Sequence, residues 1–251
     1  MTPALVVGNW KMHGTQAEGL ALVRNLAAAL GAQPPRATVA VAPPFTSLAA
    51  IGAALSATPI LLAAQNCHWE ESGAFTGEVS PLMLRDVGCR FVIVGHSERR
   101  HVFREDDHAV ARKVSAALRH GLRPILCVGE TLAERRSRRT FNVIARQLRA
   151  ALKELDESAI RQIEIAYEPV WAIGTGQNAT PEQISEVHQR IRRLLADRFG
   201  PHGGAAVRIL YGGSVKPENA PELAGAGDVN GFLVGGASLK AETFVPIARC
   251  F

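Results

Sequence analysis

Eight short apolar runs, rich in β-branched residues, recur along this 251-residue chain and constrain its fold more than any other feature. Their starts span 227 residues in seven intervals, which gives a spacing of about 32 residues. Each run is continuously apolar, as expected of parallel strands that are covered on both faces. The runs occupy residues 4–8, 38–42, 60–64, 91–95, 124–128, 163–167, 207–211 and 231–235.

Segments with helical periodicity separate these runs, most clearly at residues 16–30, 105–119, 140–155 and 181–199. Eight strand-and-helix units of this size predict an α/β fold, an eightfold β/α barrel. A doubly wound open sheet is the alternative, but it typically has fewer strands and a switch in strand order. No linker rich in Ser, Pro or Gly divides the chain, so we expect residues 1–251 to form a single domain.

Composition excludes several classes of protein. The chain is 47% hydrophobic and 20% charged, which is too apolar for an intrinsically disordered protein. We expect no membrane span, because no run approaches about 18 apolar residues, and no signal peptide, because Asn9 and Lys11 interrupt the first apolar run. The four cysteines form no CxxC pair, which favours a reducing compartment over a disulfide scaffold. We therefore expect a cytoplasmic protein.

The charge balance points to an anionic partner without identifying it. The net charge of +5 suits an anionic ligand and also fits weak contact with nucleic acid. The densest basic run is Arg135-Arg136-Ser137-Arg138-Arg139, which contains no aromatic residue. Because such charge runs usually mark a solvated helix face, we interpret it in that way and expect no nucleic-acid partner.

In a β/α barrel the chemistry lies at the carboxyl ends of the strands, where the βα loops gather. The predicted strands of this chain lead at that end into a cation, an imidazole, a carboxylate and two glycine-rich loops. These residues are Asn9-Trp10-Lys11 after the first run, His96-Ser97-Glu98-Arg99 around the end of the fourth, Glu168-Pro169 after the sixth, Gly212-Gly213-Ser214 after the seventh and Gly235-Gly236 at the end of the eighth.

The two glycine-rich loops predict a phosphate site. Glycines allow backbone N–H groups to approach a ligand closely, and the loops that follow strands seven and eight are the usual phosphate site of a β/α barrel. A single Gly-Gly pair more often makes only a tight turn. Two such pairs at these positions favour the phosphate.

Glu168 is a candidate general base, since it ends an apolar strand at a partly desolvated edge that we expect to raise its pKa. The alternative is a structural carboxylate paired with a neighbouring arginine. Residues 169–175 belong to an apolar loop bounded by proline and glycines, which predicts a lid. His96 begins a helix-like segment, and a helix N-terminus disfavours the imidazolium, so we expect a neutral ring that donates a hydrogen bond.

Lys11 is one of only five lysines and is a candidate electrostatic partner for an anionic substrate. The eight histidines show no HExxH or other zinc spacing, so we expect no metal and no cofactor. Two other activities stay open. A Schiff-base aldolase would use Lys11 as its nucleophile, and a non-catalytic anion-binding barrel would need neither His96 nor Glu168.

Six segments closely resemble the triosephosphate isomerase family, and the match as a whole runs from residue 6 to about residue 240. The resemblance implies a TIM barrel that interconverts dihydroxyacetone phosphate and D-glyceraldehyde 3-phosphate through an enediolate, in glycolysis and gluconeogenesis, without a cofactor. The segments are GNWKM (8–12), VGHSERR (94–100), CVGE (127–130), the highly specific AYEPVWAIGTG (166–176), YGGSV (211–215) and LVGGAS (233–238).

The same resemblance implies roles for individual residues. Glu168 matches the family's base, His96 its electrophile and Lys11 its cationic contact with substrate. Asn9 matches a polar neighbour of that lysine, and Glu98 matches a carboxylate near it. The phosphate-binding backbone groups that it implies are those of Gly174, Ser214, Gly235 and Gly236.

The segment from Asn66 to Ser80 is long for a βα loop and contains Trp69 and Phe75. An isolated surface excursion is one interpretation, but exposed aromatic residues on a long loop suggest an interface. In the family this loop inserts into a second subunit, and a residue matching Thr76 reaches the neighbour's site. We therefore expect a homodimer whose sites depend on assembly.

Overall fold

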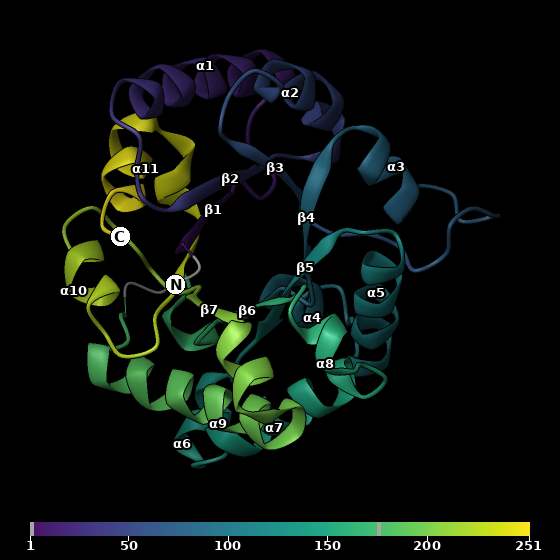
Figure 1. The fold of residues 1–251 in the computed structure, drawn as a ribbon, viewed down its shortest axis with the longest axis vertical. Helices are drawn as coiled ribbons and strands as arrows, with labels where there is room; N and C mark the ends of the chain where they lie inside the picture. The colour runs from purple at the N-terminus through teal and green to yellow at the C-terminus, as the bar shows by residue number, and fades with distance from the viewer. Residues whose placement is uncertain (1–2, 175–176) are drawn as a thin grey trace.

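The computed structural model describes residues 3–174 and 177–251, and the strands within them form a closed parallel barrel in chain order (Figure 1). The eightfold β/α barrel is confirmed, and the open-sheet alternative is wrong because β1 pairs with β8. The strands are β1 (Leu5–Asn9), β2 (Thr38–Ala42), β3 (Leu61–Ala64), β4 (Cys89–Val94), β5 (Arg123–Val128), β6 (Glu164–Tyr167), β7 (Arg208–Tyr211) and β8 (Gly231–Val234).

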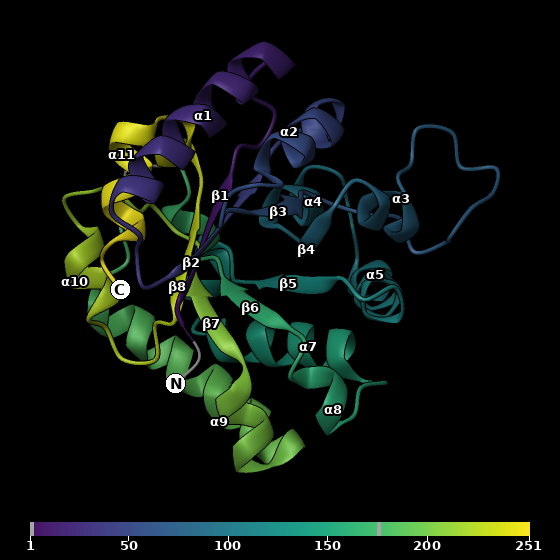
Figure 2. The same cartoon turned by 45° about the horizontal axis from the view of Figure 1, so that its top comes forward.

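Helices surround this barrel on its outside (Figures 1 and 2). The longer ones are α1 (Gln16–Ala32), α5 (Asp107–Arg119), α7 (Thr140–Leu152) and α9 (Pro181–Ala206). The shorter ones are α2 (Leu48–Leu55), α3 (Pro81–Asp86), α4 (Ser97–His101), α6 (Leu132–Arg136), α8 (Glu157–Ile160), α10 (Ala220–Ala224) and α11 (Ala241–Ala248). Single 3-10 turns are η1 (Phe45–Ser47), η2 (Val170–Ala172) and η3 (Gly236–Leu239). Among the described residues, no helix is long and apolar enough to cross a membrane.

The start of α9 follows from its first residues, whereas its end does not. The Thr180 hydroxyl accepts the N–H of Gln183 at 3.3 Å, and Pro181 occupies the first turn. The helix does not stop at residue 199, as its periodicity predicted. It kinks at Gly200, whose φ of 74° suits glycine, and then continues to Ala206.

The apolar core has two layers, one inside the barrel and one between the barrel and the helices. Successive residues of a strand face opposite sides of the sheet, so Leu5 and Val7 fill the interior while Val6 packs against helices. This two-sided burial explains the continuously apolar runs in the sequence. The four cysteines are free, and Cys67, Cys89 and Cys127 are buried.

The segment 66–80, between β3 and α3, projects away from the barrel (Figure 2). Phe75 is 44% exposed, although its ring packs on that of His68 at 4.4 Å. Trp69 does not share this exposure, because the Arg112 guanidinium of α5 stacks over its ring at 4.3 Å and His68 stacks beside it at 4.4 Å. The expectation that both aromatic residues are exposed is therefore wrong for Trp69, which holds the base of the loop on its own chain.

Candidate active site

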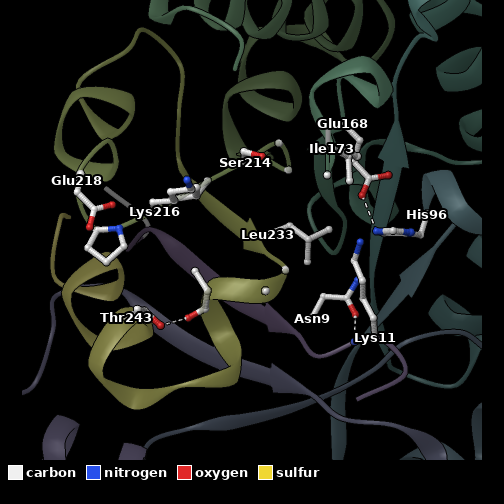
Figure 3. A pocket seen from close by; sticks show the side chains of 18 residues that line it. Asn9, Lys11, His96, Glu168, Ile173, Ser214, Lys216, Glu218, Leu233 and Thr243 are labelled. Carbon is white, nitrogen blue, oxygen red and sulfur yellow. Dashed lines mark hydrogen bonds and ion pairs between the residues drawn. The ribbon is translucent and has the colours of Figure 1, made fainter. Parts of the chain in front are cut away.

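The polar residues at the strand ends surround a cavity of about 480 Å³ at the carboxyl end of the barrel (Figure 3). Glu98 lies outside its lining and contacts two residues that line it, Lys11 and His96. The sequence-predicted residues that do line the cavity are Asn9, Lys11, His96, Glu168, Gly174, Ser214, Gly235 and Gly236.

The Glu168 carboxylate is buried, with the residue only 2% exposed. Its backbone is fixed by the end of the sheet, because the N–H of Glu168 donates to the carbonyl of Val128 at 2.8 Å. One carboxylate oxygen, Oε2, accepts the N–H of Ser97 at 2.8 Å. The other, Oε1, lies 2.9 Å from His96 Nε2, an ion-pair distance without a well-formed hydrogen bond. Both oxygens are therefore engaged by the first residues after β4.

These contacts reverse the expected titration of the carboxyl group. Burial alone would raise the pKa of Glu168, but the His96 ring and the N–H of Ser97 outweigh burial and hold that pKa below its usual value. The expectation of a raised pKa is wrong, because the sequence does not show that these two groups point at the carboxylate. Glu168 is consequently ionised at neutral pH.

His96 is the N-cap residue of α4, and this position defines its tautomer. Its Nδ1 atom accepts the N–H of Glu98 at 3.2 Å, so a neutral ring has its proton on Nε2, the nitrogen nearer Glu168. Burial by itself would lower the pKa of His96, but the Glu168 carboxylate outweighs burial and raises it. The neutral ring that we expect is therefore favoured once Glu168 turns away, when burial and the N-cap bond remain.

Lys11 has an unusual backbone conformation that its neighbours stabilise. Its φ is 54°, in the left-handed region, and its N–H donates to Asn9 Oδ1 at 3.1 Å. Gln65 Nε2 donates to the Lys11 carbonyl at 2.8 Å. The Lys11 ammonium lies 2.6 Å from a Glu98 oxygen, so the two side chains form an ion pair. A charged ammonium is a poor nucleophile, which argues against the Schiff-base alternative.

Sequence reasoning missed Gln65, although a signal was present. This residue directly follows β3, a strand that contributes none of the predicted site residues. The same rule applied to β3 identifies it. Ser97 was also missed, because its contribution is a backbone N–H that every residue type except proline carries.

The two glycine-rich loops line the same cavity but differ in their neighbours. A Cβ atom at Gly235 would lie 3.5 Å from Lys11 Cε, so the loop after β8 approaches the lysine stem closely. Gly236 opens the turn η3, whereas α10 begins only at Ala220, several residues after Ser214. Only the loop after β8 therefore leads directly into a helical turn.

The lid predicted over residues 169–175 begins as the 3-10 turn η2, and Ser214 Oγ donates to the Ala172 carbonyl at 3.1 Å. Thr175, its last predicted residue, lies outside the described residues. The first part of the lid is held by the buried carboxylate of Glu130, which accepts Trp171 Nε1–H at 2.9 Å. The Tyr167 hydroxyl lies 3.2 Å from both Glu130 oxygens.

Arg135 contacts both Glu130 and Trp171. Its Nη1 donates to Glu130 at 3.0 Å, and its guanidinium stacks over the Trp171 ring at 4.5 Å. The interpretation of the basic run as a solvated face is therefore wrong for Arg135. It is right for Arg136, Arg138 and Arg139, which are exposed.

Within residues 3–174 and 177–251, no group of three or more His, Cys, Asp or Glu side chains could hold a metal ion. The chemistry that the cavity supports is proton transfer between an ionised carboxylate and a substrate, next to an imidazole and an ammonium.

Comparisons with known proteins agree with this geometry. A family model described as triosephosphate isomerase matches residues 4–251. The chain is 53% identical over 249 residues to a triosephosphate isomerase of Syntrophotalea carbinolica, covering 99% of this chain and 98% of the relative. It is 52% identical over 243 residues to one of Chloroflexus aurantiacus, covering 97% of each. The crystal structure of triosephosphate isomerase from Bartonella henselae superimposes with a TM-score of 0.88 at 44% identity, covering 98% of each chain.

Proposed function

We propose that Glu168, His96 and Lys11 carry out the reaction that this chain catalyses. The chain belongs to the triosephosphate isomerase family and interconverts dihydroxyacetone phosphate and glyceraldehyde 3-phosphate, a reaction of glycolysis. The main support is the buried, ionised Glu168 carboxylate 2.9 Å from the His96 ring in a cavity lined by two glycine-rich loops. An anion-binding barrel without catalytic activity would have no use for this pair.

The proposed chemistry moves one proton between adjacent carbons. Glu168 removes a proton from the carbon next to the carbonyl group, and His96 Nε2–H donates to the oxygen on which negative charge develops. The Lys11 ammonium stabilises that charge. Because both Glu168 oxygens contact His96 and Ser97 in this structure, the carboxylate must release these contacts to reach the substrate.

We propose that the phosphate group of the substrate binds the backbone N–H groups of Gly174, Ser214, Gly235 and Gly236. All four residues line the cavity, and Gly174 lies in the lid. Closing an apolar lid would exclude water and protect the enediolate from losing its phosphate. The hydrogen bond from Ser214 to Ala172 connects the lid to the phosphate loop after β7.

The variant Glu168→Gln tests the assigned base. The amide cannot accept the proton, so we expect turnover to fall by about three orders of magnitude or more. Binding of a phosphorylated competitive inhibitor should be largely retained. Glu157→Gln, which removes an exposed carboxylate from α8, is the matched control and should leave turnover unchanged. Near-normal turnover of Glu168→Gln would refute the assignment.

We further propose a homodimer formed through the loop from Asn66 to Ser80, with Thr76 near the partner's site. The support is a set of exposed apolar side chains that follow β1, β2, β3 and β4. Because these strands are neighbours in the barrel, their carboxyl ends share one side of it. The side chains are Met12, Phe45, Phe75, Leu82, Met83, Val102 and Phe103. Such a concentration of exposed apolar surface is typical of an interface.

We also propose that residues 1–251 act as one catalytic domain, since β1 and β8 close the barrel and α11 packs against α1. A cytoplasmic location is part of the same proposal. The glycolytic reaction and the four free cysteines support it.

A further inference from the structure

We propose that Lys216 is a second cation of the active site, which attracts the phosphate group of the substrate at the outer part of the cavity. This inference rests on the proposed phosphate site. The cavity extends beyond the glycine-rich loops, and its outer lining includes Lys216, Pro217, Glu218 and Thr243. Figure 3 shows Lys216, Glu218 and Thr243 across the cavity from Lys11, His96 and Glu168.

The backbone of Lys216 is fixed relative to the phosphate loop. Its N–H donates to Asn219 Oδ1 at 2.7 Å, and Asn219 Nδ2 donates to the Ser214 carbonyl at 3.2 Å. The N–H of Ala220 in turn donates to the Lys216 carbonyl at 2.9 Å. One asparagine thus ties Lys216 to Ser214, two residues earlier in the loop. The ammonium extends from a rigid base.

The charge of Lys216 is not compensated as that of Lys11 is. Lys11 is paired with Glu98, and Glu168 adds a negative charge to the inner cavity. Lys216 is exposed and makes no ion pair with any described residue. Glu218, exposed on the same loop, is the charged group that opposes it. A dianion that approaches the cavity therefore meets a free positive charge at Lys216.

The expected effect is modest and has a definite kinetic form. A phosphate monoester carries nearly two negative charges at pH 7, and one exposed charge several ångströms away changes its binding about three- to fivefold at low ionic strength. Since Lys216 lies away from Glu168 and His96, it acts on capture of the substrate rather than on proton transfer. We expect changes in KM, with kcat preserved.

The test compares Lys216→Gln with Glu218→Gln and with Lys153→Gln as a control. Lys153 is 79% exposed and follows α7, at the end of the barrel opposite the cavity. Lys153→Gln therefore changes the net charge by the same amount as Lys216→Gln, but far from the cavity. We expect Lys216→Gln to raise KM and the inhibition constant of inorganic phosphate about three- to fivefold, and Glu218→Gln to lower both. Lys216→Arg should restore the wild-type values. All differences should vanish above about 0.5 M salt.

The inference is overturned if Lys216→Gln leaves both constants unchanged, or if it lowers kcat without raising KM. A change of equal size in Lys153→Gln would overturn it as well, because the effect would then belong to net charge. The assignment of the catalytic residues is tested separately: near-normal turnover of Glu168→Gln would refute it, whatever the Lys216 variants show.

Discussion

The contacts that favour the ionised form of Glu168 also hold its carboxylate against the first residues after β4. A carboxylate with 2% exposure is normally difficult to ionise, and here the N–H of Ser97 and the ring of His96 compensate for burial. In the proposed mechanism the carboxylate turns toward the substrate, loses both partners and becomes a stronger base. The same movement removes the group that raises the pKa of His96, so the ring is then favoured in its neutral, donating form. One side-chain rotation thus prepares both partners for proton transfer.

A second buried histidine makes stability depend on pH. His188 of α9 is buried, its Nδ1 lies 3.0 Å from the Asp228 carbonyl, and burial lowers its pKa to about 4. In the unfolded chain the ring binds a proton below about pH 6.5, whereas in the folded protein it does so only near pH 4. The unfolded state therefore binds more protons in this window, and stability is lost as the pH falls through it.

Because of His188, we expect the free energy of unfolding to be about 2 kcal/mol lower at pH 5 than at pH 7. The variant His188→Gln, which keeps an N–H donor for the Asp228 carbonyl, should lose correspondingly less over the same interval. Urea unfolding at both pH values and at one protein concentration measures the difference. His202→Gln, which removes an exposed histidine, is the control and should follow the wild type. An equal acid loss in wild type and His188→Gln would contradict the assignment.

At the residue scale, the sequence identifies which side chains lie at the strand ends but not how they are oriented. The strand periodicity places Glu168 and His96 at one end of the barrel. It does not show that the first residues after β4 direct a backbone N–H and an imidazole at the same carboxylate. The direction of the Glu168 pKa shift depends on that orientation, and this is why the expectation from burial alone was wrong.

At the element scale, α6 supports the lid rather than forming an independent solvated helix. Glu130 follows β5, Trp171 lies in η2, and Arg135 of α6 contacts both of them. Without Arg135, the buried Glu130 carboxylate would keep only the neutral donors of Tyr167 and Trp171. The first turn of the lid therefore depends on a short helix that is separate from it in sequence.

This arrangement predicts different effects for two adjacent arginines. We expect Arg135→Gln to lower kcat/KM about three- to tenfold, because the stacking and the charge-assisted hydrogen bond together contribute about 1 kcal/mol to the lid's position. Arg136→Gln removes the same charge from the exposed neighbour and should leave kcat/KM unchanged. Steady-state kinetics of both variants provide the measurement. Equal effects would mean that α6 acts only through its net charge.

Element types could be predicted from the sequence, and their ends less well. The predicted strands match the observed ones within one or two residues, because continuous apolar runs reflect burial on both faces. Strand ends depend on the hydrogen bonds of the neighbouring strand, which no local pattern encodes. α9 continues past residue 199 because Gly200 allows a kink rather than a stop. Arg135 was misjudged because its partners lie in β5's loop and in the lid.

At the scale of the whole molecule, the barrel is closed, but one side of it leaves apolar side chains exposed. Exposed apolar side chains follow β1 to β4, and the segment 66–80 extends outward from the same region (Figure 2). Arg112 and His68 pack on Trp69, and the Phe75 ring also packs on His68 at 4.4 Å but is still 44% exposed. The loop is thus held on its own chain through Trp69 and His68 and still exposes part of the Phe75 ring, an arrangement suited to a second copy. The sequence predicts the loop but cannot divide its residues between these two roles.

This division predicts that a charge on α3 separates the proposed dimer without altering the site of its own chain. Met83 is 54% exposed and does not line the cavity. Burying a carboxylate there without a partner should raise the dissociation constant of the dimer about 100-fold or more. By light scattering at micromolar concentration, we expect Met83→Glu to be monomeric and the wild type to have the mass of two chains.

Activity should follow assembly in this variant, because the proposed contribution of Thr76 comes from the neighbouring chain. Specific activity of Met83→Glu is expected to be low when dilute and to rise with protein concentration as dimers form. Phe141→Glu introduces the same charge at a residue that is 36% exposed on α7, outside the proposed interface, and should remain an active dimer. A fully active monomer of either the wild type or Met83→Glu would show that each barrel completes its own site, and the proposed dependence on assembly would then be wrong.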